Sequence, residues 1–146
     1  MSLDELQPER ARARRFGFCS LFVWAALGLA LEAAHGFKWS SYLDDAMTRE
    51  LLRLAHAHGV GLALLSLIYA GEGTPLFAHR ADRGRPVRQL LAAASLLMPV
   101  GFALATIHHS EGDPGLAIWL VPLGGVCLLS ALAWSAVASI RHTRDR

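Results

Sequence analysis

Four long apolar stretches constrain the fold of this chain of 146 residues more than any other feature. They cover residues 16–36, 55–71, 90–107 and 116–140. A helix rises about 1.5 Å per residue, so some 20 apolar residues span the roughly 30 Å hydrocarbon core of a bilayer. Hydrophobic residues make up 53% of the chain, which exceeds the share usual in a soluble domain. The sequence therefore predicts an all-α integral membrane four-helix bundle, formed by a single membrane domain over residues 1–146.

The Lys and Arg residues lie mainly on one side of this predicted bundle. Eleven of the 14 precede the first stretch, join the second to the third, or follow the fourth, and only Lys38, Arg49 and Arg53 fall on the other side. Positively charged loops resist translocation, so we expect both termini to be cytoplasmic in a multi-pass protein of the inner (cytoplasmic) membrane. The net charge of +2 then reflects topology, and membrane lipid rather than nucleic acid is the expected partner.

The connection between the first two stretches has a helical pattern of its own. Leu43, Met47 and Leu51 recur at helical spacing, while charged residues take the positions between them. This pattern predicts an amphipathic helix at the membrane surface over residues 43–53, which runs on into the second span. Ser41 or Asp44 is expected to cap its N-terminus.

Five of the seven histidines fall at the ends of the apolar stretches that the predicted topology brings to one side of the membrane. They are His35, His56, His58, His108 and His109. Imidazole binds haem iron, copper and zinc, so this clustering predicts a metal or haem site without choosing the metal. His56 and His58 lie about 200° apart around a helix, so we expect only one of them to point squarely into the bundle.

Glu32 and His35 are three residues apart, so they share one face of the first helix. A carboxylate inside a membrane segment is costly and suggests function. Two interpretations stay open: Glu32 and His35 are metal ligands, in a second site together with His108 and His109, or Glu32 pairs with His35 or Arg53 at the interface. Di-iron bundles use the Glu-x-x-His pattern twice, whereas it occurs once here.

Several short motifs follow one another along the chain in a characteristic order. They are residues 35–37 (HGF) before Tyr42, residues 53–59 (RLAHAHG), residues 99–102 (PVGF), residues 111–113 (EGD), then Val121 and Pro122, and a basic tail. In order and spacing this set resembles the family of membrane-bound styrene oxide isomerases, and the resemblance covers most of the chain.

The resemblance implies a homotrimer that holds b-type haem between neighbouring subunits. The family's axial histidine opens the second helix in an Ala-His context, which matches His56, with His58 as the alternative ligand. In that family ferric iron acts as a Lewis acid on the oxygen of a small apolar epoxide, and ring opening with a hydride shift gives an aldehyde. The asparagine and tyrosine that position the epoxide there correspond to Leu62 and Ala103 here, so the resemblance implies haem binding more directly than isomerase activity. It assigns no catalytic residue.

Two hypotheses of other classes stay open beside this resemblance. The protein could be a haem-free membrane metalloprotein that binds copper, zinc or di-iron through the periplasmic-side histidines and Glu32. It could also be an accessory subunit of a larger membrane complex, in which the histidines line an interface. Metal analysis and copurification with larger chains would distinguish them.

Overall fold

Helices form every secondary-structure element of this protein in the computed structural model, which describes residues 3–77, 81–107, 109 and 112–144. The four long helices are α1 (Leu3–Gly36), α3 (Ala46–Ile68), α4 (Ala81–Leu104) and α5 (Leu120–Arg144). The short elements are α2 (Ser40–Leu43), a π-helical turn (Tyr69–Gly73) and two 3-10 turns (Thr74–Phe77 and Leu116–Trp119). The all-α prediction is confirmed.

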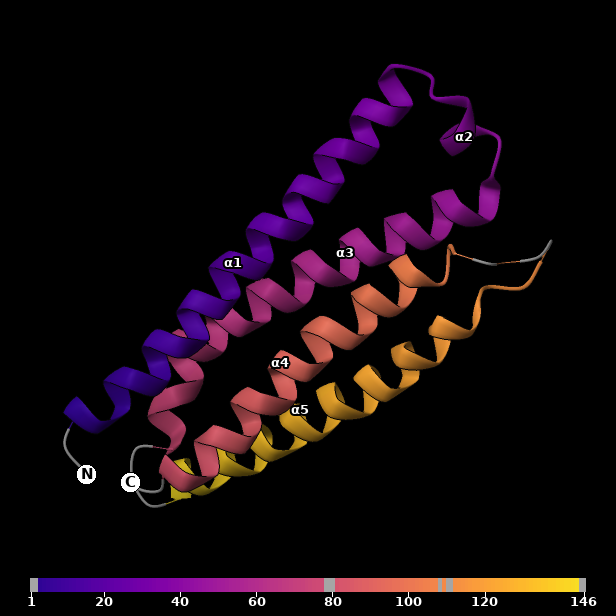
Figure 1. The fold of residues 1–146 in the computed structure, drawn as a ribbon. Helices are drawn as coiled ribbons and strands as arrows, with labels where there is room; N and C mark the ends of the chain where they lie inside the picture. The colour runs from indigo at the N-terminus through magenta and orange to yellow at the C-terminus, as the bar shows by residue number, and fades with distance from the viewer. Residues whose placement is uncertain (1–2, 78–80, 108, 110–111, 145–146) are drawn as a thin grey trace.

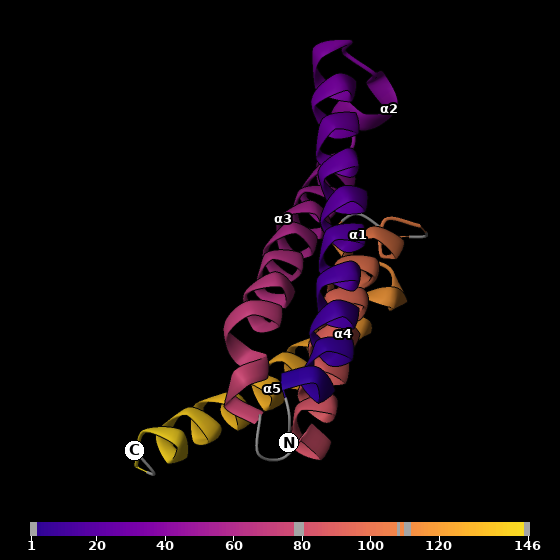
Figure 2. The same cartoon turned by 90° about the vertical axis from the view of Figure 1, so that its left-hand side faces the viewer.

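The long helices pack as neighbours in chain order, with α1 on α3, α3 on α4 and α4 on α5 (Figure 1). Seen from the α1 side, α5 runs obliquely to α1 (Figure 2). The start of α1 and the end of α5 lie at one end of the bundle (Figure 1). The opposite end, where α1 finishes and α3 begins, we call the distal end.

Four segments, one for each long helix, are long and apolar enough to cross a membrane. They are Gln7–Gly36, Ala46–Phe77, Gly84–Leu104 and Leu116–Arg141. The outer helices α1 and α5 leave much of their apolar surface exposed, including Phe22, Leu29 and Leu129. Such exposed faces suit a lipid environment, so the fold is compatible with a multi-pass membrane protein.

The α1–α3 pair is packed closely through glycines. A Cβ atom at Gly59 of α3 would lie 2.2 Å from the ring of Trp24, which fills that space. A Cβ atom at Gly17 of α1 would lie 2.7 Å from the side chain of Leu67. Small residues let membrane helices approach in this way. Trp24 is itself buried in a core cluster with Leu51, Ala55, Phe102 and Ala105, which joins α1, α3 and α4.

The N-terminus of α3 is capped by Asp45, whose Oδ1 accepts a hydrogen bond from the backbone N–H of Thr48 at 2.9 Å. The prediction of Ser41 or Asp44 as the cap is wrong, because Asp44 closes α2, where its backbone N–H donates to Ser40 at 2.8 Å. The helix that begins at Ala46 continues without a break to Ile68, so most of the amphipathic segment forms the first turns of α3.

At the end opposite the distal end, polar contacts tie α1 to the other helices. The guanidinium of Arg10 donates to the carbonyls of Ala70 and Gly71 in the π-helical turn, at 2.9 and 3.2 Å. Glu9 of α1 forms an ion pair with Arg88 of α4 at 2.6 Å. These contacts fix the position of α1 along α3, on which the geometry at the distal end depends.

Candidate functional site between α1 and α3

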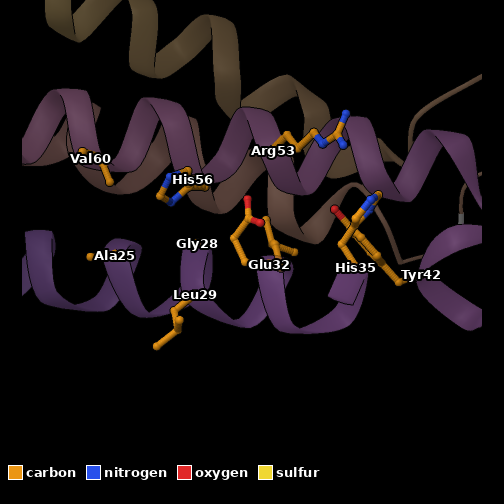
Figure 3. Close-up of a pocket in the computed structure, with 10 residues that line it drawn as sticks. Ala25, Gly28, Leu29, Glu32, His35, Tyr42, Arg53, His56 and Val60 are labelled. Carbon is orange, nitrogen blue, oxygen red and sulfur yellow. The ribbon is translucent and has the colours of Figure 1, made fainter. Parts of the chain in front are cut away.

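A cleft of about 520 Å³ opens between α1 and α3 in the distal half of the bundle (Figure 3). Its lining residues are Ala25, Gly28, Leu29, Leu31, Glu32, His35, Tyr42, Arg53, His56 and Val60. Along its length the lining changes from apolar, at Ala25 and Val60, to polar at the distal end (Figure 3). Such a gradient suits a ligand with an apolar body and a polar end.

The ring of His56 lies in the middle of this cleft and is held by the main chain of α1. Its Nδ1 is 2.8 Å from the carbonyl oxygen of Trp24. A carbonyl oxygen only accepts, so Nδ1 donates and, in the neutral ring, Nε2 carries the lone pair. Within the described chain no residue hydrogen-bonds to this Nε2. The ring of His56 is therefore held in one orientation, and its Nε2 has no partner among the described residues.

Gly28 makes this position of His56 possible. A Cβ atom there would lie 2.3 Å from Cε1, 2.6 Å from Nδ1 and 3.0 Å from Nε2 of the imidazole. Ordinary contacts between such atoms are about 3.5–4.0 Å. A side chain of any size at Gly28 would displace the ring.

The distal half of the cleft contains polar groups that have no hydrogen-bond or ion-pair partner among the described residues. Glu32 and His35 lie on α1, Arg53 lies on α3, and Tyr42 comes from α2 (Figure 3). Among the described residues Glu32 forms no ion pair with either His35 or Arg53. The interpretation that Glu32 pairs with one of them at the interface is thus not what the structure shows. These groups remain available to a ligand.

His58 is directed away from the cleft. Its Nδ1 donates to the carbonyl of Leu54 in its own helix at 2.8 Å, and its ring packs against Phe102 of α4 with a centroid distance of 4.9 Å. His56 faces α1 and His58 faces α4, so the two imidazoles lie on different faces of α3. Of these two histidines of α3, the structure places only His56 in the cleft.

His109 lies at the N-terminus of α3, outside the cleft. Its Nε2 is 2.8 Å from Oδ2 of Asp45 and 3.1 Å from Oγ1 of Thr48. The backbone N–H of Thr48, followed by its hydroxyl and by His109, holds the pKa of the Asp45 carboxyl below its usual value. His109 is thus engaged with the helix cap. His108 lies outside the described residues.

The proposed second metal site is not assembled from the residues that the structure places. Within residues 3–77, 81–107, 109 and 112–144, no group of three His, Cys, Asp or Glu side chains is arranged to hold a metal ion. Glu32 and His35 share the cleft with His56, whereas His109 is held elsewhere.

Two contributors to the cleft were not singled out from the sequence as site residues. Tyr42 reads in the sequence as an interfacial aromatic, yet only 7% of it is exposed and its hydroxyl faces the cleft (Figure 3). Gly28 was one glycine in an apolar run. Leu62 is buried and Ala103 packs on the core cluster around Phe102, so neither lines the cleft.

Comparison with protein-family models, with curated proteins and with solved structures gives no match to this chain. The geometry of the cleft and the chemistry of its residues are therefore the basis for assigning a function.

Proposed function

We propose that this protein is an inner-membrane protein that binds b-type haem in the cleft between α1 and α3, with Nε2 of His56 as the axial ligand. The orientation of His56 carries the proposal. Histidines that bind metals usually donate their other ring N–H to a carbonyl or carboxylate, which fixes the tautomer and raises the basicity of the ligand nitrogen. The 2.8 Å contact from Nδ1 to Trp24 is an arrangement of this kind.

The number of available ligands favours haem over a haem-free copper, zinc or di-iron centre. Structural and catalytic zinc sites use three or four protein ligands, and di-iron bundles use more. Haem supplies four nitrogen ligands itself and needs one from the protein. The described side chains offer two imidazoles in the cleft, His56 and His35, and no group of three metal-binding residues. This is fewer than a haem-free centre requires, whereas the single protein ligand that haem needs can be supplied by His56.

The other residues of the cleft have separate roles in this proposal. Gly28 leaves room for the imidazole, and the carbonyl of Trp24 holds the ring in place. Ala25, Leu29 and Val60 give the half of the cleft away from the distal end an apolar lining, which suits an apolar macrocycle. When bound, the haem iron supplies a Lewis-acid centre. This lining favours a small apolar ligand near that centre.

The likeness to styrene oxide isomerases supports haem binding more than isomerase activity. The positions that match the family's epoxide-positioning asparagine and tyrosine carry Leu62 and Ala103, which have no polar side-chain group and lie outside the cleft. We therefore propose haem binding as the function and expect little aldehyde from styrene oxide. A homotrimer with cytoplasmic termini is part of the same proposal. The apolar outer faces of α1 and α5 provide the surface that such an assembly would use.

A pair of matched variants tests the role of His56. His56→Ala and His58→Ala remove the same imidazole group at positions two residues apart on α3. Only His56 lines the cleft, whereas His58 packs against Phe102. Haem titration of the detergent-purified proteins should show binding in the wild type and His58→Ala, with no His-ligated spectrum in His56→Ala. Loss in His58→Ala alone would make His58 the ligand. Unchanged binding in both variants would remove the proposed site.

A further inference from the structure

The distal end of the cleft contains a cation and a phenol that have no partner within the described chain. Arg53 lines the cleft and forms no ion pair there, although Glu32 lies across from it on α1 (Figure 3). The ring of Tyr42 is buried, and its hydroxyl points into the cleft without a hydrogen bond from any described residue. Arg53 is exposed and the Tyr42 hydroxyl opens onto the cleft, so both donors are accessible to a ligand bound there.

We propose that Arg53 and Tyr42 form a binding subsite for a carboxylate at the distal end of the cleft. The planar guanidinium has five N–H donors whose spacing matches the two oxygens of a carboxylate, and the phenol adds one O–H donor. His35, on the α1 side of the same end, is a further donor when its ring N–H faces the ligand. Three donors from three segments, α1, α2 and α3, thus line the same end of the cleft.

This inference rests on the proposed function, because the carboxylates that we expect the subsite to bind are the propionates of haem b. Haem b has an apolar macrocycle and two propionates, which correspond to the apolar and polar halves of the cleft. His56 lies between these halves, so a macrocycle held there would direct its carboxylates to one end or the other. The only cation that lines the cleft among the described residues is Arg53, at the distal end. A fatty acid carries the same head group and is the other possible source of a carboxylate.

Glu32 provides a control of opposite sign within the same cleft. Its carboxylate lies between His56 and the Arg53 end (Figure 3). A bound anion is attracted by Arg53 and repelled by Glu32. Removing the charge of Arg53 should therefore weaken carboxylate binding, whereas removing the charge of Glu32 should strengthen it. A general loss of folding would not produce this pair of opposite effects.

The experiment compares haem b with its dimethyl ester, which lacks both carboxylates. Both are titrated into detergent-purified wild type, Arg53→Gln, Glu32→Gln and Lys38→Gln. Lys38 is an exposed cation near the distal end that does not line the cleft, so its variant controls for net charge. We expect the wild type and Lys38→Gln to prefer the acid by roughly tenfold, the order of one charge-assisted hydrogen bond. Arg53→Gln should lose this preference and Glu32→Gln should increase it.

The outcomes separate this subsite from the haem proposal itself. Equal binding of haem b and its dimethyl ester by the wild type would overturn the subsite and leave haem binding intact. This comparison uses the wild type alone, so it does not depend on whether a variant folds. An unchanged preference in Arg53→Gln would also overturn it. If the wild type binds neither haem b nor its dimethyl ester, the haem proposal fails. The same proteins are then titrated with palmitate and methyl palmitate. A preference for palmitate that depends on Arg53 would support the subsite, whereas no preference would overturn it.

Discussion

Replacing Gly28 with alanine tests whether the position of His56 depends on the space that α1 leaves for it. The new Cβ atom would lie 2.3 Å from Cε1 of His56. To restore an ordinary contact of about 3.5 Å the ring must move by roughly 1 Å. The hydrogen bond from Nδ1 to Trp24, now 2.8 Å, would then be stretched or bent out of good geometry.

Two costs follow from that displacement. Overpacking of the α1–α3 contact should destabilise the fold by about 1–3 kcal/mol. Loss of the group that orients a metal-binding histidine lowers metal affinity about 10–100-fold. We therefore expect Gly28→Ala to bind haem about 10–100-fold more weakly, as measured by absorbance titration.

Gly61→Ala is the matched control for this experiment. Gly61 lies in α3, and a Cβ atom there would meet no atom within 4 Å. Alanine in a helix interior is favoured over glycine by about 1 kcal/mol, so this variant should be folded and bind haem normally. Wild-type affinity and spectrum in Gly28→Ala would refute the reasoning, because His56 could then bind haem without the geometry described.

Two further predictions concern the contacts that support the cleft. Gly59→Ala places a Cβ atom 2.2 Å from the ring of Trp24, so the α1–α3 pair should lose about 1–3 kcal/mol of stability; an unchanged thermal midpoint in detergent would contradict this. The Thr48 N–H lowers the pKa of Asp45, so this carboxylate stabilises the fold above its unfolded pKa of 3.8, and the gain is lost as pH falls through the lower folded pKa. Asp45→Asn keeps a capping side chain but removes its charge. The protection of the first turn of α3 against hydrogen exchange should therefore fall at low pH in the wild type and not in Asp45→Asn. The same pH dependence in the two proteins would argue against this prediction.

The helical architecture follows from the sequence because hydropathy and length act locally. Each apolar run predicts a helix from its own residues, and the structure has a long helix at each of the four. Boundaries were less predictable, since Asp44 and Asp45 are adjacent and chemically identical. Only the fold shows that Asp45 caps α3 while Asp44 ends α2.

The candidate site depends more on tertiary contacts than on local pattern. The separation of two residues between His56 and His58 predicts that only one points squarely into the bundle, and the structure directs them to α1 and α4 respectively. The choice between them could not come from spacing. It rests on the carbonyl of Trp24, 32 residues away along the chain, and on the glycine contacts that bring α1 close to α3. The partner of His109 is set in the same way by a contact 64 residues distant.

The visible absorption spectrum of the detergent-purified protein, recorded before and after addition of haem, tests the central claim most directly. We predict a Soret band typical of a His-ligated b-type haem, which saturates at one haem per chain. Acidified organic solvent should extract this haem, because no covalent bond holds it. A spectrum without a Soret band as purified, together with no spectral change of added haem beyond that seen in detergent alone, would contradict the account.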